Sequence, residues 1–106
     1  MKKGDIVLIP FPFTNLTGAK QRPALILHTN EAFIIVVFIT SRLKWKERHD
    51  VIVEPTNENG LKKRSLIRCA KIATLDSDMA SGILGNLGSK DLDMVNEHLK
   101  EILELS

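Results

Sequence analysis

The segment from residue 21 to residue 42 constrains the fold of this 106-residue chain more than any other segment. It contains two runs rich in apolar and β-branched residues, 22–27 and 32–40, which is typical of strands. Residues 28–31 separate the runs, and their polar side chains suit a turn. The segment therefore predicts a β-hairpin.

The hairpin would place polar groups at its open end. If it turns near residues 29–30, the numbers of opposed residues sum to about 60, so Arg22 lies across from residues 38–40. Thr40 and Ser41 then bring two hydroxyls close to the Arg22 guanidinium. An apolar hairpin alone indicates only a core, whereas a polar cluster at its mouth suggests a binding site.

Length and composition predict one domain, residues 1–106, because the chain is 43% hydrophobic and neither half could bury a core alone. The longest apolar run, 32–39, is too short to cross a membrane. The N-terminal Met-Lys-Lys could open a signal peptide, but Asp5 and Pro10 interrupt the apolar segment that follows. We therefore expect a cytoplasmic protein without membrane contact. Cys69 is the only cysteine, which excludes an internal disulfide and a cysteine cluster for zinc.

Charge is distributed unevenly along the chain. The net charge is only +2, but residues 1–75 carry 13 Lys and Arg against 6 Asp and Glu. Residues 76–106 carry 2 against 7. This asymmetry is expected if a basic β portion meets an anion while an acidic helix faces elsewhere, although unequal solvated faces also occur without function.

The rest of the chain predicts short strands and one final helix, which makes the fold mainly β (α+β), a small barrel with a C-terminal helix. Leu92, Val95 and Leu99 have helical spacing, and Ser89 suits the N-cap. The predicted elements are a strand at 5–9 ended by the prolines of 10–13, a loop at 14–20, a basic loop at 42–49, a strand at 50–54, a turn at 57–60, a strand at 65–75, a helical turn at 76–81, an extended piece at 82–88 and a helix at 90–105.

The histidines and the cysteine give weak signals for chemistry. His28, His49 and His98 fall on a turn, a loop and the polar side of a helix, with no metal-ligand spacing between them. We expect each of them to be a surface residue. Cys69 lies inside a predicted strand without an adjacent activating group, so we interpret it as a small buried hydrophobe.

The mouth of the hairpin gives a stronger signal. An arginine fork beside the hydroxyls of Thr40 and Ser41 can bind a phosphate in bidentate fashion. The alternative is that Arg22 merely ends a strand and Thr40 fills space. Trp45, among the cations of the basic loop, could stack on a base of single-stranded nucleic acid. It suits a hydrophobic anchor of the loop equally well.

Taken in order, these pieces resemble the MazF/PemK family of toxins from toxin–antitoxin modules. The resemblance covers nearly the whole chain, and the ordered set of pieces is more specific than any one of them. It rests on Gly4-Asp5-Ile6-Val7, a polar loop, Gln21-Arg22-Pro23, Phe38-Ile39-Thr40-Ser41, Gly60-Leu61-Lys62-Lys63, Ser65-Leu66-Ile67-Arg68-Cys69 and Ile72-Ala73-Thr74-Leu75-Asp76.

The resemblance implies an SH3-like β-barrel with a C-terminal helix, a homodimer, and an endoribonuclease that cleaves single-stranded RNA without metal or cofactor. A cognate antitoxin would inhibit it. The implied catalytic residues are Arg22 and Thr40, with Arg68 as a third candidate. RNA contacts would come from Lys20, Gln21, Ser41, Arg42 and Trp45.

The chain departs from the family pattern at two points. One branch of the family carries an acidic residue two positions after the Arg68 equivalent, where this chain has Ala70. The polar loop also lacks that branch's histidine and offers Asn15, Thr17 and Lys20 instead. The general base is therefore unassigned, and a non-catalytic small-barrel module that binds RNA or protein is the alternative function.

Overall fold

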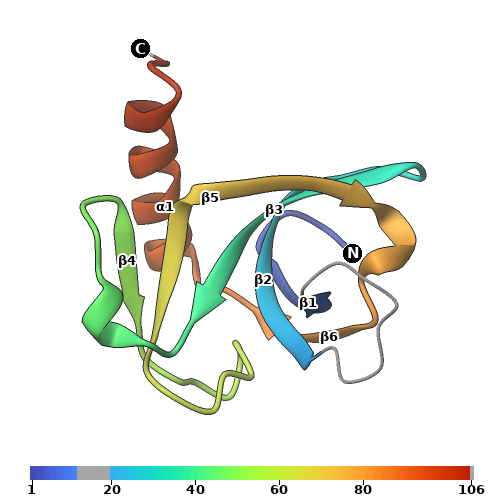
Figure 1. The fold of residues 1–106 in the computed structure, drawn as a ribbon, viewed down its shortest axis with the longest axis horizontal. Coiled ribbons are helices and arrows are strands. Elements are labelled where there is room, and N and C mark those ends of the chain that lie inside the picture. Colours follow the sequence, from blue (N-terminus) through green and yellow to red (C-terminus); the bar gives the residue numbers. More distant parts are fainter. Residues whose placement is uncertain (12–19, 106) are drawn as a thin grey trace.

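The structure, a computed structural model, describes residues 1–11 and 20–105. Its six strands form one antiparallel sheet in the order β4-β5-β3-β2-β1-β6, and the sheet curls strongly, with α1 beside β4 and β5 (Figure 1). The elements are β1 (Asp5–Phe11), β2 (Lys20–Thr29), β3 (Phe33–Thr40), the 3-10 turn η1 (Leu43–Trp45), β4 (Asp50–Val53), β5 (Ser65–Asp76), the 3-10 turn η2 (Ser77–Met79), β6 (Gly82–Asn86) and α1 (Ser89–Ile102). The predicted mainly-β class with a C-terminal helix is confirmed.

The predicted hairpin is β2 and β3. The pairs run from Ala24 opposite Phe38 to Thr29 opposite Ile34, with a bulge after Ile26. Asn30 closes the turn, because its side-chain oxygen accepts hydrogen bonds from the backbone N–H groups of Ala32 and Phe33.

The prediction that prolines end β1 at Ile9 is wrong. The strand continues through Pro10, which pairs with Gln21 of β2. On its other side, β6 pairs only with residues 5–8 of β1. Among the described residues, no strand lies beside this edge of β1 from Ile9 onward, and an unpaired edge tolerates a residue that lacks an N–H donor.

Two apolar clusters cover the two faces of the sheet. Val95 and Leu99 of α1 pack on the first cluster, with residues such as Ile67 and Cys69 of β5. The second cluster lies on the other face, over β1, β2 and β3. Both follow from the alternation of side chains along each strand.

The loop between β4 and β5 closes the curl of the sheet against β6. The backbone N–H of Asn86 donates to the carbonyl of Glu58 at 2.8 Å. Gly60 has a φ of +70°, and a Cβ there would lie 2.3 Å from the carbonyl oxygen of Leu84. Only glycine fits this close approach in a left-handed conformation.

The C-terminal helix differs from the predicted helix at both ends. Gly88, not Ser89, is the N-cap, because the carbonyl of Gly88 already accepts the first helical hydrogen bond from Leu92. The helix ends at Ile102 rather than Leu105. Glu104 adopts a φ of +56°, and the N–H of Leu105 donates to the carbonyl of Lys100, which forms a Schellman motif.

Candidate functional site

The mouth of the hairpin carries the residues that the sequence singled out. When the β2–β3 register is continued by two residues from the Ala24–Phe38 pair, Arg22 aligns with Thr40. On its other side Arg22 pairs with Ile9 of β1. Its side chain is exposed, whereas Thr40 is half-buried and its Oγ1 accepts a hydrogen bond from the N–H of Arg42 at 3.2 Å.

A groove of about 1190 Å³ opens at this mouth. It extends over β2, β3, β5 and the loop that closes the sheet. Its described lining consists of Leu8, Lys20, Arg22, Pro23, Phe38, Ile39, Thr40, Ser41, Arg42, Trp45, Gly60, Leu61, Lys62, Lys63, Ser65, Arg68, Lys71, Ile72, Ala73 and Leu84.

The groove is strongly cationic. Seven of its described lining residues are Lys or Arg, and none of the described lining residues is Asp or Glu. Such a channel attracts polyanions and gives binding that depends on salt. Seven of the 13 Lys and Arg of residues 1–75 thus line one groove, and Arg22, Thr40, Ser41 and Arg42 are all part of its lining.

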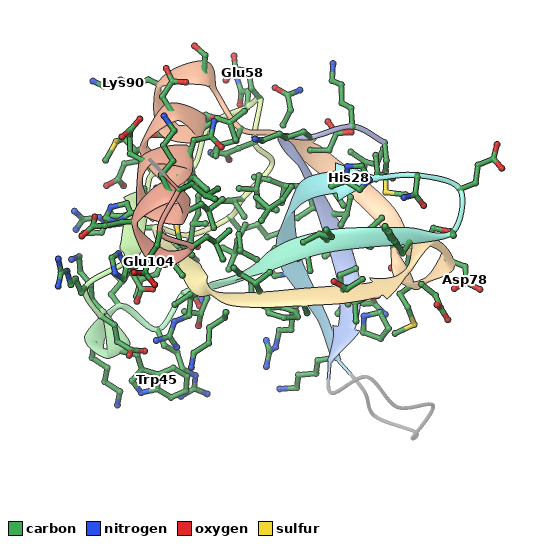
Figure 2. All side chains as sticks on the ribbon, turned by 90° about the horizontal axis from the view of Figure 1, so that it is seen from above. His28, Trp45, Glu58, Asp78, Lys90 and Glu104 are labelled. Atoms are coloured by element: carbon green, nitrogen blue, oxygen red, sulfur yellow. The ribbon has the colours of Figure 1, made fainter. Side chains whose placement is uncertain are left out.

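Trp45 presents its ring at the edge of the groove. Its exposure of 48% decides against a buried anchor of the basic loop. The guanidinium carbon of Arg42 lies 4.9 Å from the centre of the indole ring, which is cation–π distance. Figure 2 shows Trp45 projecting from the molecule, where a base could stack on it.

Arg68 also lines the groove, but its guanidinium already has partners. It forms an ion pair with Glu47, and its Nε lies 3.5 Å from the Oδ2 of Asp50, within ion-pair range but outside hydrogen-bond geometry. Asp50 lies directly across from Arg68 in the β4–β5 register. The guanidinium of Arg68 therefore lies between two carboxylates. Arg22, in contrast, forms no ion pair with any described carboxylate.

Sequence reasoning missed the two carboxylates beside Arg68. Glu47 sits in the basic loop and Asp50 begins β4, so neither is close to Arg68 along the chain. A signal was available for Asp50, since antiparallel pairing of 50–54 with 65–75 would have placed a charged pair across the two strands. The turn that carries them is held by two hydrogen bonds between Glu47 and Asp50, at 2.9 and 3.1 Å.

Gln21 and Lys20, also predicted to contact RNA, differ in their position relative to the groove. Gln21 is not among the lining residues, and its side-chain oxygen accepts a hydrogen bond from the Ser81 hydroxyl at 2.7 Å. Lys20 begins β2 and lines the groove. Asn15 and Thr17 of the predicted polar loop lie outside the described residues.

Cys69 is fully buried under α1, as expected for a small hydrophobe. Burial, followed by the nearby negative charge of Asp50, raises the pKa of the Cys69 thiol to about 11. A thiol with such a pKa stays protonated at neutral pH, which excludes it as a nucleophile.

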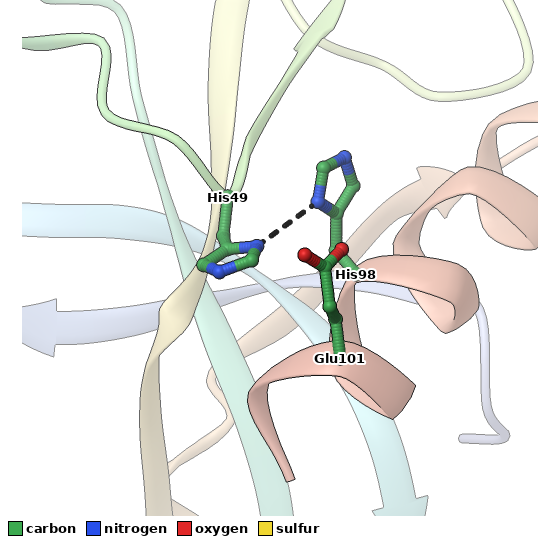
Figure 3. Close-up of side chains that lie close together, drawn as sticks. All are labelled: His49, His98 and Glu101. Carbon is green, nitrogen blue, oxygen red and sulfur yellow. Dashed lines mark hydrogen bonds between the residues drawn. The ribbon is translucent and has the colours of Figure 1, made fainter. Parts of the chain in front are cut away.

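The structure brings together three side chains that the sequence left separate. His49 precedes β4, and its Nδ1 lies 3.2 Å from the Nδ1 of His98 on α1 (Figure 3). The carboxylate of Glu101 joins them, and the three ligand atoms lie within 4.8 Å of one another. The sequence predicted each of these histidines to be a surface residue and gave no sign that His49 and His98 contact each other. Both are half-buried.

In the part of the chain that the structure describes, no helix has the length and apolar character needed to span a membrane. The one long helix, α1, has a polar outer face and an apolar inner face.

Several solved structures have the same fold as this chain. MazF in a MazE-MazF complex from Deinococcus radiodurans has a TM-score of 0.79 and 21% identity, covering 100% of this chain and 97% of that chain. Mycobacterium tuberculosis toxin MazF-mt6 has a TM-score of 0.76 and 22% identity over 96% and 98%. An endoribonuclease in complex with its cognate antitoxin from a mycobacterial species has a TM-score of 0.74 and 20% identity, covering 100% of this chain and 97% of that chain.

Sequence comparison identifies the family independently of the fold. No curated protein matches the chain by sequence. The family profile described as PemK-like, MazF-like toxin of type II toxin-antitoxin system matches residues 2–103. Because the match spans nearly the whole sequence, this chain belongs to the PemK-like, MazF-like family of toxins of type II toxin–antitoxin systems.

Proposed function

We propose that this toxin cleaves single-stranded RNA without a metal ion, acts as a homodimer and is inhibited by a cognate antitoxin. The observation that carries the proposal is the cationic groove around Arg22 and Thr40, which has no acidic residue in its described lining. Family membership supports the reaction, and the toxin–antitoxin complexes among the similar structures support the partner.

The reaction starts with attack of a ribose 2′-hydroxyl on the adjacent phosphorus. The 5′-oxygen of the next nucleotide leaves, which gives a 2′,3′-cyclic phosphate and a 5′-hydroxyl. The added negative charge on phosphorus must be stabilised, and preorganised cationic donors do this best in a site from which water is partly excluded. The exposed guanidinium of Arg22 is free of described carboxylates and can bind this phosphorane in bidentate fashion.

Thr40 would hold the scissile phosphate through its hydroxyl, while Ser41 contacts the neighbouring RNA. Lys20, Arg42 and Trp45 would then extend the contacts along the strand by charge and by stacking. Gln21 would contact RNA only if its side chain exchanges Ser81 for the ligand. Arg68 has a supporting role, because its guanidinium is bound to Glu47 and lies beside Asp50.

Glu47 is our candidate for the general base that Ala70 fails to provide. Its carboxylate contacts a lining arginine, and its side chain remains 63% exposed, so that it can turn toward bound RNA. Asp50 is a poorer candidate because it is buried and its carboxylate holds the Glu47 turn. The variant Glu47→Gln should slow cleavage at neutral pH, where the concentration of solvent hydroxide is too low to replace the base.

The decisive experiment incubates the purified protein with mixed-sequence single-stranded RNA and a chelator. We expect discrete fragments with 5′-hydroxyl ends, and no cleavage of the same RNA carrying 2′-O-methyl groups. Arg22→Ala and Thr40→Ala should keep the folded structure and lose cleavage by about 100-fold or more.

Arg64→Ala is the matched control, because Arg64 is exposed, pairs with Glu54 and lies outside the described groove lining. A shifted but intact RNA would instead indicate a non-catalytic binding module. Full cleavage and growth arrest by both Arg22→Ala and Thr40→Ala would overturn the assignment of the site.

A further inference from the structure

We propose that His49, His98 and Glu101 form a binding site for a transition-metal dication, with Zn²⁺ as the best fit. None of the three residues lines the groove, so the site is separate from the proposed RNA site and does not depend on the proposed function. The bound ion would join the start of β4 to α1, where the described contacts are packing, the His49–His98 hydrogen bond and the exposed Arg48–Glu101 ion pair.

The distance between the two imidazoles matches a zinc site. Two nitrogen ligands at the usual Zn–N length, arranged tetrahedrally, are separated by roughly 3.3 Å. The Nδ1 atoms of His49 and His98 are 3.2 Å apart, and the rings meet nearly edge-on at 79°. An ion placed between the rings would therefore meet both nitrogens with little movement of either.

Glu101 supplies the third ligand. It follows His98 by three residues on α1, so both side chains project from the same face of the helix. The three ligand atoms span at most 4.8 Å, and rotation of the glutamate side chain can shorten the remaining distance. Two imidazoles and one carboxylate form a donor set that zinc accepts, with water in the fourth position.

The protein backbone holds the ligands in place before an ion arrives. His49 lies between the two hydrogen-bonded residues of the turn, Glu47 and Asp50. His98 is flanked on α1 by Val95 and Leu99, which are buried in the core. Because both histidines sit on anchored backbone, binding costs little ordering of the chain.

The surroundings attract a cation. Asp93, Met94, Glu97, His98 and Glu101 line a shallow hollow of about 270 Å³ on α1. Its carboxylates raise the local concentration of dications. Arg48 competes, since its Nη2 lies 2.7 Å from Glu101, but this pair is exposed and worth little, so a dication can replace it.

The simpler interpretation is a hydrogen bond between the histidines, with one ring as donor and the other as acceptor. That interpretation predicts no effect of zinc on these rings. Titrating the chelator-treated full-length protein with ZnCl₂ separates the two. We expect one ion per chain, a Kd in the micromolar range or below, and a rise in Tm of several degrees at a hundredfold excess over Kd.

Imidazole ¹⁵N spectra should show that both rings bind the ion through Nδ1. The His49→Gln and His98→Gln variants should each weaken zinc binding by at least about tenfold, and Glu101→Gln should weaken it more than Glu97→Gln, its matched control on the same helix. His28→Gln should leave binding unchanged, because His28 lies near the end of β2, where its ring contacts the side chain of Asn30. A millimolar Kd, or wild-type affinity in both His49→Gln and His98→Gln, would overturn the proposal.

Discussion

The groove and the outer face of α1 carry opposite charges, and they differ in how many of their charged side chains form ion pairs. In the groove, Arg68 is paired with carboxylates, while the other six lining cations form no ion pair with a described residue. On α1, Glu97 and Glu101 are paired with Lys100 and Arg48. Unpaired cations in a groove indicate an anionic ligand, whereas Glu101 on α1 already has a cationic partner, Arg48, which a bound dication would have to displace.

Because these two regions have opposite signs, the net charge of +2 does not indicate which ligands this protein can bind. Two regions of opposite sign nearly cancel in the sum, but they lie on different parts of the fold. One of them suits a nucleic acid, and the other, through its histidine pair, suits a small cation. If the two regions are independent, a substitution in one of them should leave the properties of the other unchanged.

The largest effect is expected where the groove depends on closure of the sheet. Gly60→Ala would place a methyl group 2.3 Å from the Leu84 carbonyl oxygen and force a left-handed alanine. We expect the free energy of unfolding to fall by about 2–5 kcal/mol, measured by urea denaturation. Cleavage should fall with it, because Gly60 and Leu84 both line the groove.

Gly82→Ala is the control for this prediction. Gly82 is the first residue of β6, and a Cβ there meets nothing within 4 Å. Its stability should change by less than about 1 kcal/mol. Equal losses for the two variants would show that glycine flexibility, not the close approach at Leu84, governs the closure.

Two ion pairs near the C-terminal end of the basic loop, Arg68–Asp50 and Arg48–Glu101, should differ in their contribution to stability. Arg68→Ala leaves the buried Asp50 without its cation, so we expect a loss of about 2–4 kcal/mol in unfolding free energy. Arg48→Ala removes the exposed pair with Glu101 and should cost less than about 1 kcal/mol. A similar cost for both variants would contradict the structural role given to Arg68.

A smaller effect should appear at alkaline pH. Because the folded thiol of Cys69 has its pKa raised to about 11, the unfolded chain loses this proton first as the pH rises above 9. Stability is therefore unaffected below the unfolded pKa and falls between pH 9 and 11, by about 1 kcal/mol at pH 10. Subtracting the pH profile of Cys69→Ala from that of the wild type should isolate this loss; identical slopes would argue against a raised pKa.

The smallest effect is expected in the salt dependence of RNA binding. Lys62→Ala removes one groove cation, so the slope of log K against log salt for an uncleavable 2′-O-methyl RNA should decrease in magnitude by about 0.7. Lys100→Ala, on α1, should leave the slope unchanged. Equal changes would mean that RNA contacts both regions and that the comparison fails.

The hairpin and the groove mouth could be predicted because their signals are local. Two apolar, β-branched-rich runs separated by a polar turn predict the pairing of β2 and β3, and this pairing places Arg22 near Thr40. The sites on β4 and α1 could not be predicted, because the meeting of His49 and His98 depends on how a helix packs on a curled sheet. The continuation of β1 through Pro10 could not be predicted. It depends on where β6 stops pairing with β1, and β6 lies far along the chain.

The turn from Glu47 to Asp50 links the two regions. Glu47 forms an ion pair with Arg68, which lines the groove, while His49, two residues later, contacts His98 on α1. Any coupling between the binding free energies of two sites on this turn must be reciprocal. If zinc changes the affinity of the toxin for RNA by some factor, RNA must change its affinity for zinc by the same factor, so a zinc titration can report on the groove without any cleavage.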